Sequence, residues 1–425
     1  MTMMQASGDH AARPRLTHLL AVARREFIAH GYQHSSVDGI ARAASVSKET
    51  IYRYFPDKRA LFRAAAEGLQ EEFAARLAAV DETADAEDII GRFALQIYDS
   101  AAEGGHLSLI WLTIAIAREF PALADALYRG GVERLEPVRQ RLAVIAGARG
   151  FDGMVTIDHA AGLGAMAVEG PRHVMGWPAL EGADRQRHAR ATARLFLNGC
   201  LAGSGAAVPL ARPPDQPAEP PLPAPARGDH IATLMAVARR HFEERGYRGA
   251  SLDEIGAEAR VGRGTLYRHF AGKDGLFESV MLDVATELSM AAVRDLPALD
   301  PAEEPAAVLL RFARAVSPVL TSPASIALHR TVIAEARRAP RLARQVYTRV
   351  RLGLTLPLTD YLAAGAASGR FVVDDPDWYA RQLLTLVAGG NRPLSAASSP
   401  DAATRDAIAR RAVTTFLYGF GRALD

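Results

Sequence analysis

The sequence of 425 residues has little cysteine, few aromatic residues and almost no net charge. Its single cysteine, Cys200, excludes an internal disulfide and a cysteine-rich zinc site, and it favours a reducing compartment such as the cytoplasm. Aromatic residues make up only 7% of the chain, whereas alanine, leucine and arginine are abundant, and this composition favours helices over β-sandwiches. The net charge of +2 says nothing by itself about nucleic acid. These shortages favour an all-α, cytoplasmic protein.

Long apolar runs are also missing. The longest strongly apolar run, from Leu107 to Ala117, is followed by Arg118 and is far shorter than the roughly 18 residues that a membrane span requires. The residues before Leu16 lack the apolar segment of a signal peptide. We therefore expect neither a membrane span nor a secretion signal.

One block of sequence occurs twice in the chain. Residues 19–62 match residues 234–277 without a gap, at an offset of 215 positions. Beyond this block the similarity weakens but persists at offsets of 219 and 220, for example between Arg118 and Arg337. The chain is therefore predicted to contain one domain plan twice, each copy with a well-matched front and a diverged helical back.

Prolines crowd the segment between the two copies. Eight of them fall between Pro209 and Pro225, a density that excludes a helix or a central strand and favours an extended, semi-rigid spacer. The expected boundaries are 1–14 for a flexible arm, 15–62 and 229–277 for the two front domains, 63–203 and 278–425 for the two helical back domains, and 204–228 for the linker.

The pattern of the first front domain predicts three helices. Apolar residues at helical spacing run up to Phe27, and Gly31 ends this helix. Ser36 and Ser47 are suited to cap two further short helices, and Pro56 stops the last of them. Two short helices joined by a tight turn form a helix-turn-helix, whose last helix can enter the major groove of DNA.

The second front domain predicts the same plan, with a capping box formed by Ser251 and Glu254 at the start of its second helix. Positive charge is concentrated in these two regions. Residues 13–60 hold nine basic and four acidic residues, and residues 227–274 hold nine basic and seven acidic residues. Basic segments of this kind suit contact with nucleic-acid phosphates.

The most specific motif lies in the last two helices of each front domain. Ser36-Val-Asp-Gly-Ile-Ala41, Val46-Ser-Lys-Glu-Thr-Ile-Tyr-Arg-Tyr-Phe55 and the matching Thr265-Leu-Tyr-Arg-His-Phe270 resemble the N-terminal signature of the TetR family of bacterial repressors. The resemblance covers about fifty residues in each copy. It implies an all-α fold of two tandem units, each a helix-turn-helix domain followed by a helical ligand-binding and dimerisation domain.

The resemblance also implies which residues meet double-stranded DNA. The recognition helices would span 47–55 and 262–270. Lys58 and Lys273 match the lysine that anchors the following helix on the DNA backbone in the family. The predicted DNA-binding positions of the recognition helices are Ser47, Lys48, Glu49, Thr50, Tyr52 and Tyr54 in the first copy and Arg263, Thr265, Tyr267 and His269 in the second.

The chain departs from the family pattern in two places. Ser45 and Arg260 stand in the turn where the family usually has glycine, and we expect modest strain there if φ is positive. Gly262 and Gly264 open the second recognition helix and predict a looser start. Tyr52 suits either a packed position or a phosphate contact, and on a short basic helix we favour the phosphate contact.

The back domains offer candidates for a ligand cavity but no catalytic site. The sequence shows no nucleophile elbow, carboxylate pair or metal-ligand spacing of histidines, so we expect no enzyme, no cofactor and no metal. Each cavity candidate also suits an ordinary core position. The candidates are Phe93, Tyr98, Trp111, Phe120, Met166, His173 and Trp177 in the first copy, and Phe312, His329, Tyr361, Trp378 and Asn391 in the second.

Two copies in one chain favour a covalent pseudo-dimer, because ordinary members of the family are homodimers that bind a palindrome. The final helices, expected at 190–202 and 411–424, would pack together through small residues. A lipophilic ligand would enter a back domain, move the recognition helices and release the operator DNA. The operator would be asymmetric, because the two recognition helices differ.

Two other arrangements fit the same sequence. A dimer of full chains would carry four DNA-binding domains. Alternatively, the protein is a ligand- or protein-binding module whose second DNA-binding domain has decayed, as its weaker charge and two glycines would suggest.

Overall fold

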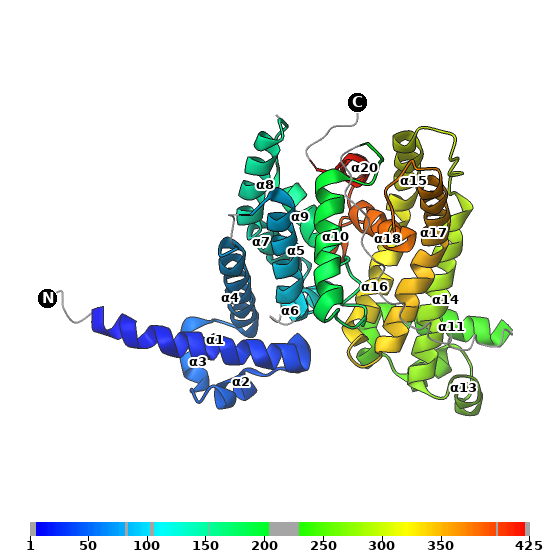
Figure 1. Cartoon of the computed structure of the whole chain (residues 1–425). Helices are drawn as coiled ribbons and strands as arrows, with labels where there is room; N and C mark the ends of the chain where they lie inside the picture. The colour runs from blue at the N-terminus through cyan, green and yellow to red at the C-terminus, as the bar shows by residue number, and fades with distance from the viewer. Residues whose placement is uncertain are drawn as a thin grey trace.

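The computed structural model describes residues 6–80, 84–102, 106–151, 153–203, 229–396 and 398–420, which form twenty α-helices and no strand (Figure 1). The all-α prediction is confirmed. The linker predicted at 204–228 lies outside the described residues. Within the described part of the chain, no helix is both long and apolar enough to cross a membrane.

The first ten helices form the first unit, residues 6–203, and the last ten form the second unit, residues 229–420. The first unit contains α1 (Ala6–His34), α2 (Val37–Ala43), α3 (Lys48–Tyr54), α4 (Lys58–Ala78), α5 (Ala86–Ala102), α6 (His106–Ile116), α7 (Pro121–Glu133), α8 (Glu136–Ala148), α9 (Ile157–Ala167) and α10 (Gly182–Asn198). The second contains α11 (Asp229–Gly249), α12 (Leu252–Glu258), α13 (Arg263–Phe270), α14 (Lys273–Arg294), α15 (Pro305–Leu320), α16 (Pro323–Glu335), α17 (Pro340–Ala367), α18 (Pro376–Val387), α19 (Arg392–Ser395) and α20 (Ala402–Tyr418).

The two units stand side by side, with α10 and α20 between them and the helix-turn-helix domains at the lower ends in Figure 1. We call these domains the first head (residues 15–62) and the second head (residues 229–277). Each head packs around one edge-to-face phenylalanine pair, Phe27 with Phe62 at 5.1 Å and Phe242 with Phe277 at 5.0 Å between ring centres. The repeated sequence therefore builds the same core twice.

Several helix boundaries differ from the sequence-based expectations. The first helix begins at Ala6, inside the segment expected to be a flexible arm, and residues 1–5 lie outside the described part. The capping box predicted for the second head is wrong: the Ser251 side chain makes no capping hydrogen bond, and the Glu254 side chain forms an ion pair with Arg245. In the first head, Ser36 caps α2 as predicted by accepting a hydrogen bond from Gly39 N at 2.9 Å.

The final helices also end earlier than the expected ranges 190–202 and 411–424. Helix α10 stops at Asn198 and α20 at Tyr418, because the next residues, Gly199 and Gly419, have φ of 70° and 82°. A glycine directly after a helix can adopt a positive φ that ends the helix, and the expected ranges did not take this into account. The prediction that these two helices pack together holds, since α10 and α20 are in contact.

The turn inside each helix-turn-helix has the positive φ for which we expected modest strain. Ser45 and Arg260 both have φ of 54°, in the left-handed region that disfavours side chains with a Cβ. Both heads therefore carry a strained residue at the same place.

Replacing Ser45 or Arg260 by glycine is expected to stabilise the protein by about 0.5–1 kcal/mol, because glycine adopts positive φ without a steric penalty. Urea unfolding followed by circular dichroism measures the change. The matched control is Ala43→Gly at the end of α2, where glycine meets ordinary helical backbone and should destabilise. A loss of stability in both Ser45→Gly and Arg260→Gly would contradict the argument.

Candidate nucleic-acid interface and ligand cavity

Each recognition helix buries one face and exposes the other. In α3, Ile51 faces the core, whereas Tyr52 and Tyr54 are 43% and 42% exposed. In α13, Leu266 is buried and Tyr267 is 59% exposed. Large exposed aromatic side chains on a basic surface suit contact with a partner rather than packing, so the structure supports an outward role for the tyrosines.

The first residue of each recognition helix is a cation held by an aspartate of the preceding helix. Lys48 Nζ lies 2.9 Å from a carboxylate oxygen of Asp38, and Arg263 donates two hydrogen bonds to Asp253 at 2.8 and 2.6 Å. Both pairs are exposed, and the hydrogen bond raises the pKa of Lys48 and of Arg263. The cations therefore stay charged and are held at the same place in both heads.

The remaining predicted DNA-binding residues lie on the same two helices or, for Ser47, directly before one of them. Ser47 caps α3 by accepting a hydrogen bond from Thr50 N at 3.0 Å. Glu49 and His269 are exposed, and Thr50 and Thr265 are half-buried. Nine of the ten predicted recognition-helix residues thus lie on two short helices, and the tenth, Ser47, caps the first of them.

Lys58 and Lys273 have a role inside each head that the sequence did not indicate. Lys58 Nζ donates to Gln33 O at 3.5 Å and lies 4.4 Å above the centre of the Tyr32 ring. Lys273 repeats this arrangement with the carbonyl of Arg248 at 3.3 Å and the ring of Tyr247 at 4.6 Å. Burial lowers the pKa of both lysines. Each lysine joins the start of the fourth helix of its head to the end of the first.

The two units close on each other through a reciprocal pair of backbone hydrogen bonds. Cys200 N donates to Phe416 O at 2.9 Å, and Phe420 N donates to Phe196 O at 2.8 Å. Both the donors and the acceptors are 220 positions apart, so a local two-fold axis passes between the bonds. The rings of Phe196 and Phe420 stack across this axis at 4.9 Å.

Gly199 and Gly419 permit this close approach. A Cβ on Gly199 would lie 2.2 Å from Leu417 O, and a Cβ on Gly419 would lie 2.2 Å from Leu197 O. No side chain fits at either position without separating the helix ends.

A second reciprocal contact joins each back domain to the opposite head. Arg118, which follows α6, donates to the carbonyls of Glu243 and Glu244 at 3.2 and 2.7 Å. Arg337, its counterpart after α16, donates to Ile28 O in the first head and to Ser108 Oγ at 2.9 Å. Because Ile28 and Glu243 are 215 positions apart, each arginine holds the same point of the other unit's first helix. We call Arg118 and Arg337 the cross-unit arginines.

The heads also meet directly near this junction. Arg248 Nη1 lies 2.6 Å from His34 Nε2, and Trp111 Nε1 donates to Ile333 O at 2.6 Å. The guanidinium of Arg337 stacks 4.5 Å from the centre of the Trp111 ring. The ends of α1, α6, α11 and α16 therefore form one contact region between the units.

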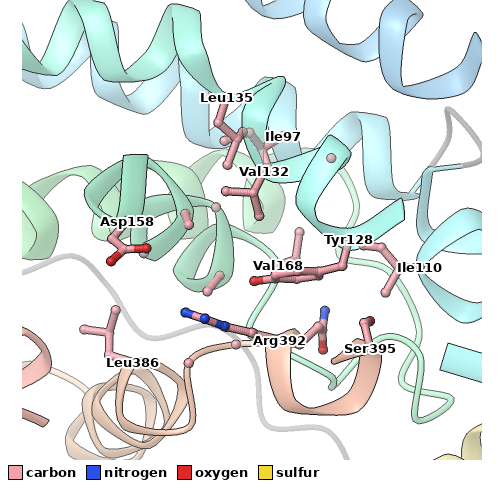
Figure 2. A pocket seen from close by; sticks show the side chains of 18 of the residues that line it. Ile97, Ile110, Tyr128, Val132, Leu135, Asp158, Val168, Leu386, Arg392 and Ser395 are labelled. Carbon is pink, nitrogen blue, oxygen red and sulfur yellow. The ribbon is translucent and has the colours of Figure 1, made fainter. Parts of the chain in front are cut away.

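A cavity of about 180 Å³ lies in the first unit and is partly covered by the second (Figure 2). Its apolar walls come from α4, α5, α6, α7, α9 and α10, and its cover comes from α20 and the segment around α19. Its polar lining includes Gln70, Tyr128, Asp158, His159, Asn391, Arg392 and Arg411. Apolar cavities of roughly 150 Å³ bind molecules such as benzene, so the volume is sufficient for a small ligand.

The polar groups of the cavity differ in charge. Asp158 forms an ion pair with Arg411 across the two units at 3.1 Å. Burial raises the pKa of Tyr128 to about 12, so its hydroxyl remains a neutral donor. Burial, with a contribution from Arg411, lowers the pKa of His159, which favours the neutral ring.

The structure places few of the predicted ligand residues around this cavity. Asn391 lines it, whereas Trp111, His173 and Trp177 line a second hollow of about 260 Å³ between the units. Phe120 packs against Tyr32 in the first head. The others are buried in the packed interior: Phe93, Tyr98, Met166, Phe312, His329, Tyr361 and Trp378.

Sequence reasoning missed the charged lining of the cavity, because Asp158, Arg392 and Arg411 come from three distant segments. One usable signal was present: Gly162 and Gly164 open space on α9, where a helix of ordinary composition would carry side chains.

Comparisons with known families agree with this architecture. The model of the N-terminal domain of bacterial regulatory proteins of the tetR family matches residues 19–65 and again residues 234–280. The model described as AefR-like transcriptional repressor, C-terminal domain, matches residues 307–422. Two heads of one kind and a matching back domain define a tandem transcriptional regulator. The chain belongs to the TetR family, with two units in tandem.

Individual relatives resemble parts of the chain. An uncharacterized HTH-type transcriptional regulator of Mycobacterium tuberculosis is 33% identical over 138 residues, which cover 32% of this chain and 65% of the relative, just under two thirds of its length. A homologous regulator of Mycobacterium bovis matches equally. Among solved structures, a TetR-family regulator of Mesorhizobium loti is 23% identical with a TM-score of 0.40 and covers 45% of this chain and 97% of its own. The Flavonoid-responsive Regulator FrrA is 27% identical with a TM-score of 0.39, over 45% of this chain and 96% of its own.

Proposed function

We propose that this protein represses transcription as a single-chain pseudo-dimer that binds one operator with its two heads. The observation that carries the proposal is the reciprocal closure of the two units, with paired backbone bonds at Cys200 and Phe420 and paired cross-unit arginines. Each unit occupies the place that a second subunit takes in a homodimer. Two linked heads can then face adjacent half-sites one helical turn apart, roughly 34–36 Å.

The proposed pseudo-dimer competes with a dimer of full chains. Light scattering on the purified chain distinguishes the two, because one chain has a mass of 45.6 kDa. A mass of one chain, both free and on a single operator, is the expected result. A stable species of twice that mass on DNA would favour four heads.

A second alternative, a decayed second head, has less support. The tethered cation, the exposed tyrosine and the lysine that joins two helices recur in both heads. Tyr52→Ala and Tyr267→Ala therefore should each weaken DNA binding without lowering thermal stability. If only Tyr52→Ala weakens binding, the second head does not bind DNA.

We further propose that a small lipophilic molecule in the cavity releases the operator. The cavity is lined by Gln70 and Phe73 of α4, whose start belongs to the first head, and by Leu109, Ile110 and Thr113 of α6. Helix α6 leads to Arg118, which holds the second head. A ligand that displaces α4 and α6 would thus shift both heads, and small shifts break the register of two half-sites.

The operator is expected to be asymmetric, since Lys48 and Glu49 open one recognition helix and Arg263 opens the other between two glycines. Arginine suits guanine and glutamate suits cytosine, and each good pairing discriminates by about 1–3 kcal/mol. The site selected from a random DNA library should therefore bind more tightly than two palindromes built by doubling either half. Equal affinity for either palindrome would show that the heads are equivalent.

A further inference from the structure

Larger side chains occupy three positions of the second unit that match cavity-lining positions of the first. The residue 219 positions after Val132 is Arg351, and those 220 positions after Asp158 and Gly164 are Trp378 and Leu384. Arg351, Trp378 and Leu384 are buried at 6%, 5% and 0% exposure. At these three positions the second copy therefore buries larger side chains than those that line the cavity of the first.

The charge around the open cavity is unbalanced. Asp158 is already paired with Arg411, and His159 and Tyr128 favour their neutral forms. Among the described residues, no carboxylate pairs with Arg392, which starts α19 in the second unit. Figure 2 shows its guanidinium and the Tyr128 hydroxyl both pointing into the cavity toward the Asp158 side. One positive charge and one hydroxyl donor therefore face the space without an acceptor.

Asn391, on the same wall, adds one acceptor, which pairs with a donor and not with an anion. A buried side-chain oxygen of Asn391 has no hydrogen-bond partner, and its amide nitrogen donates to Gly170 O at 3.4 Å. The opposite walls, from Ile97, Leu127 and Leu135, are apolar. An occupant that meets Arg392 and the Tyr128 hydroxyl must then combine an apolar body with a group that accepts hydrogen bonds and carries negative charge.

We propose, on the basis of the proposed ligand-controlled function, that the cavity binds one amphipathic carboxylate per chain. The carboxylate meets Arg392 of the second unit and the hydroxyl of Tyr128 of the first, and the apolar body lies along α4 to α7 and α9. Arginine binds a carboxylate through two parallel N–H donors, and a desolvated hydroxyl donor beside it strengthens the preference for an anion. The ligand then contacts both units at once, so a single molecule per chain can change the positions of both heads.

Isothermal titration calorimetry of the full chain with octanoate and with 1-octanol tests this assignment. The wild type should bind one octanoate per chain and bind octanol more weakly. Arg392→Met should weaken octanoate binding about tenfold or more and change octanol binding less than twofold, because only the charge-assisted bonds are lost. Arg129→Met, an exposed arginine on α7 paired with Asp125, is the matched control and should change neither.

Gly164→Leu separates this assignment from the proposed function. The only atom within 4 Å of a Cβ on Gly164 would be Leu135 Cδ1 at 3.8 Å, and leucine is the residue that the second unit has at the matching position, so the variant should fold and fill the cavity. It should weaken the binding of octanoate and of octanol more than tenfold.

If Gly164→Leu leaves the binding of both ligands unaffected, the cavity is not the ligand site and the proposed ligand control fails. If Gly164→Leu blocks the binding of both ligands, while Arg392→Met changes the two affinities equally or not at all, only the carboxylate assignment is wrong. Two octanoates per chain would overturn the single site.

Discussion

Replacing Gly199 or Gly419 by alanine is expected to lower the free energy of unfolding by about 3 kcal/mol or more and to abolish tight operator binding. Both glycines have φ above 65° with ψ near 180°, a backbone region that is open essentially only to glycine. A Cβ at either position would also lie 2.2 Å from a backbone oxygen of the other unit. The helix ends must then separate, and the reciprocal bonds of Cys200 and Phe420 are lost with them.

Urea unfolding and DNA titration of each variant measure these two losses. Gly203→Ala is the matched control, because Gly203 also has positive φ, at 84°, but no atom within 4 Å of its would-be Cβ. It should cost about 1 kcal/mol from backbone strain alone and leave operator binding intact. If Gly199→Ala and Gly203→Ala behave alike, the close approach of the two units contributes nothing to stability or to DNA binding.

The heads could be predicted from the sequence because their determinants are local. Ser47 before Lys48 caps a helix, Pro56 stops it, and the apolar spacing fixes which face is buried, so α3 was placed to within one residue. The place of Ser45 and Arg260 in the turn indicated strain if φ were positive, and the structure has φ of 54° at both. The capping box at Ser251 failed because Arg245, on the preceding helix, competes for Glu254, and such competition depends on tertiary contacts.

The cavity and the unit interface could not be predicted in the same way. Phe93 and Phe312, which the sequence suggested as cavity residues, are buried in the core, because large apolar side chains fill a core and do not leave space in it. The space instead arises where side chains are small, at Gly162 and Gly164, and where segments of two units meet. The ion pair between Asp158 and Arg411 could not be predicted from the residue pattern of either segment, because 253 positions separate the two residues.

The repeat contained information about the interface that periodicity lacks. Arg118 and Arg337 match at an offset of 219, as do Pro121 with Pro340 and Tyr128 with Tyr347 near them. In the structure, each arginine donates hydrogen bonds to backbone carbonyl oxygens near the end of the first helix of the opposite unit. The match that the sequence used only as a sign of the repeat is thus a contact made twice across a local two-fold axis.

The double variant Arg118→Ala, Arg337→Ala is expected to bind the operator at least tenfold more weakly while keeping its secondary structure. Hydrogen bonds from a charged donor contribute about 1.5–3 kcal/mol each, and these hold both heads against the opposite unit. Without them the heads sample several separations, and only the fraction with the correct spacing binds both half-sites. Each single variant should show a smaller loss, because the other arginine still holds one head.

Distances between spin labels at Arg53→Cys and Arg268→Cys, two exposed and matching positions on the recognition helices, measure this effect directly. The single native cysteine, Cys200, is buried and should not react with the label. The distance distribution should be narrow with both arginines present and broad in the double variant, and operator DNA should narrow it again in the double variant.

Arg129→Ala removes an exposed arginine that pairs with Asp125 within α7, and it controls for the loss of positive charge. If the double variant keeps a narrow distribution and full affinity, the separation of the heads is fixed elsewhere, and the direct contact between Arg248 and His34 becomes the next element to remove.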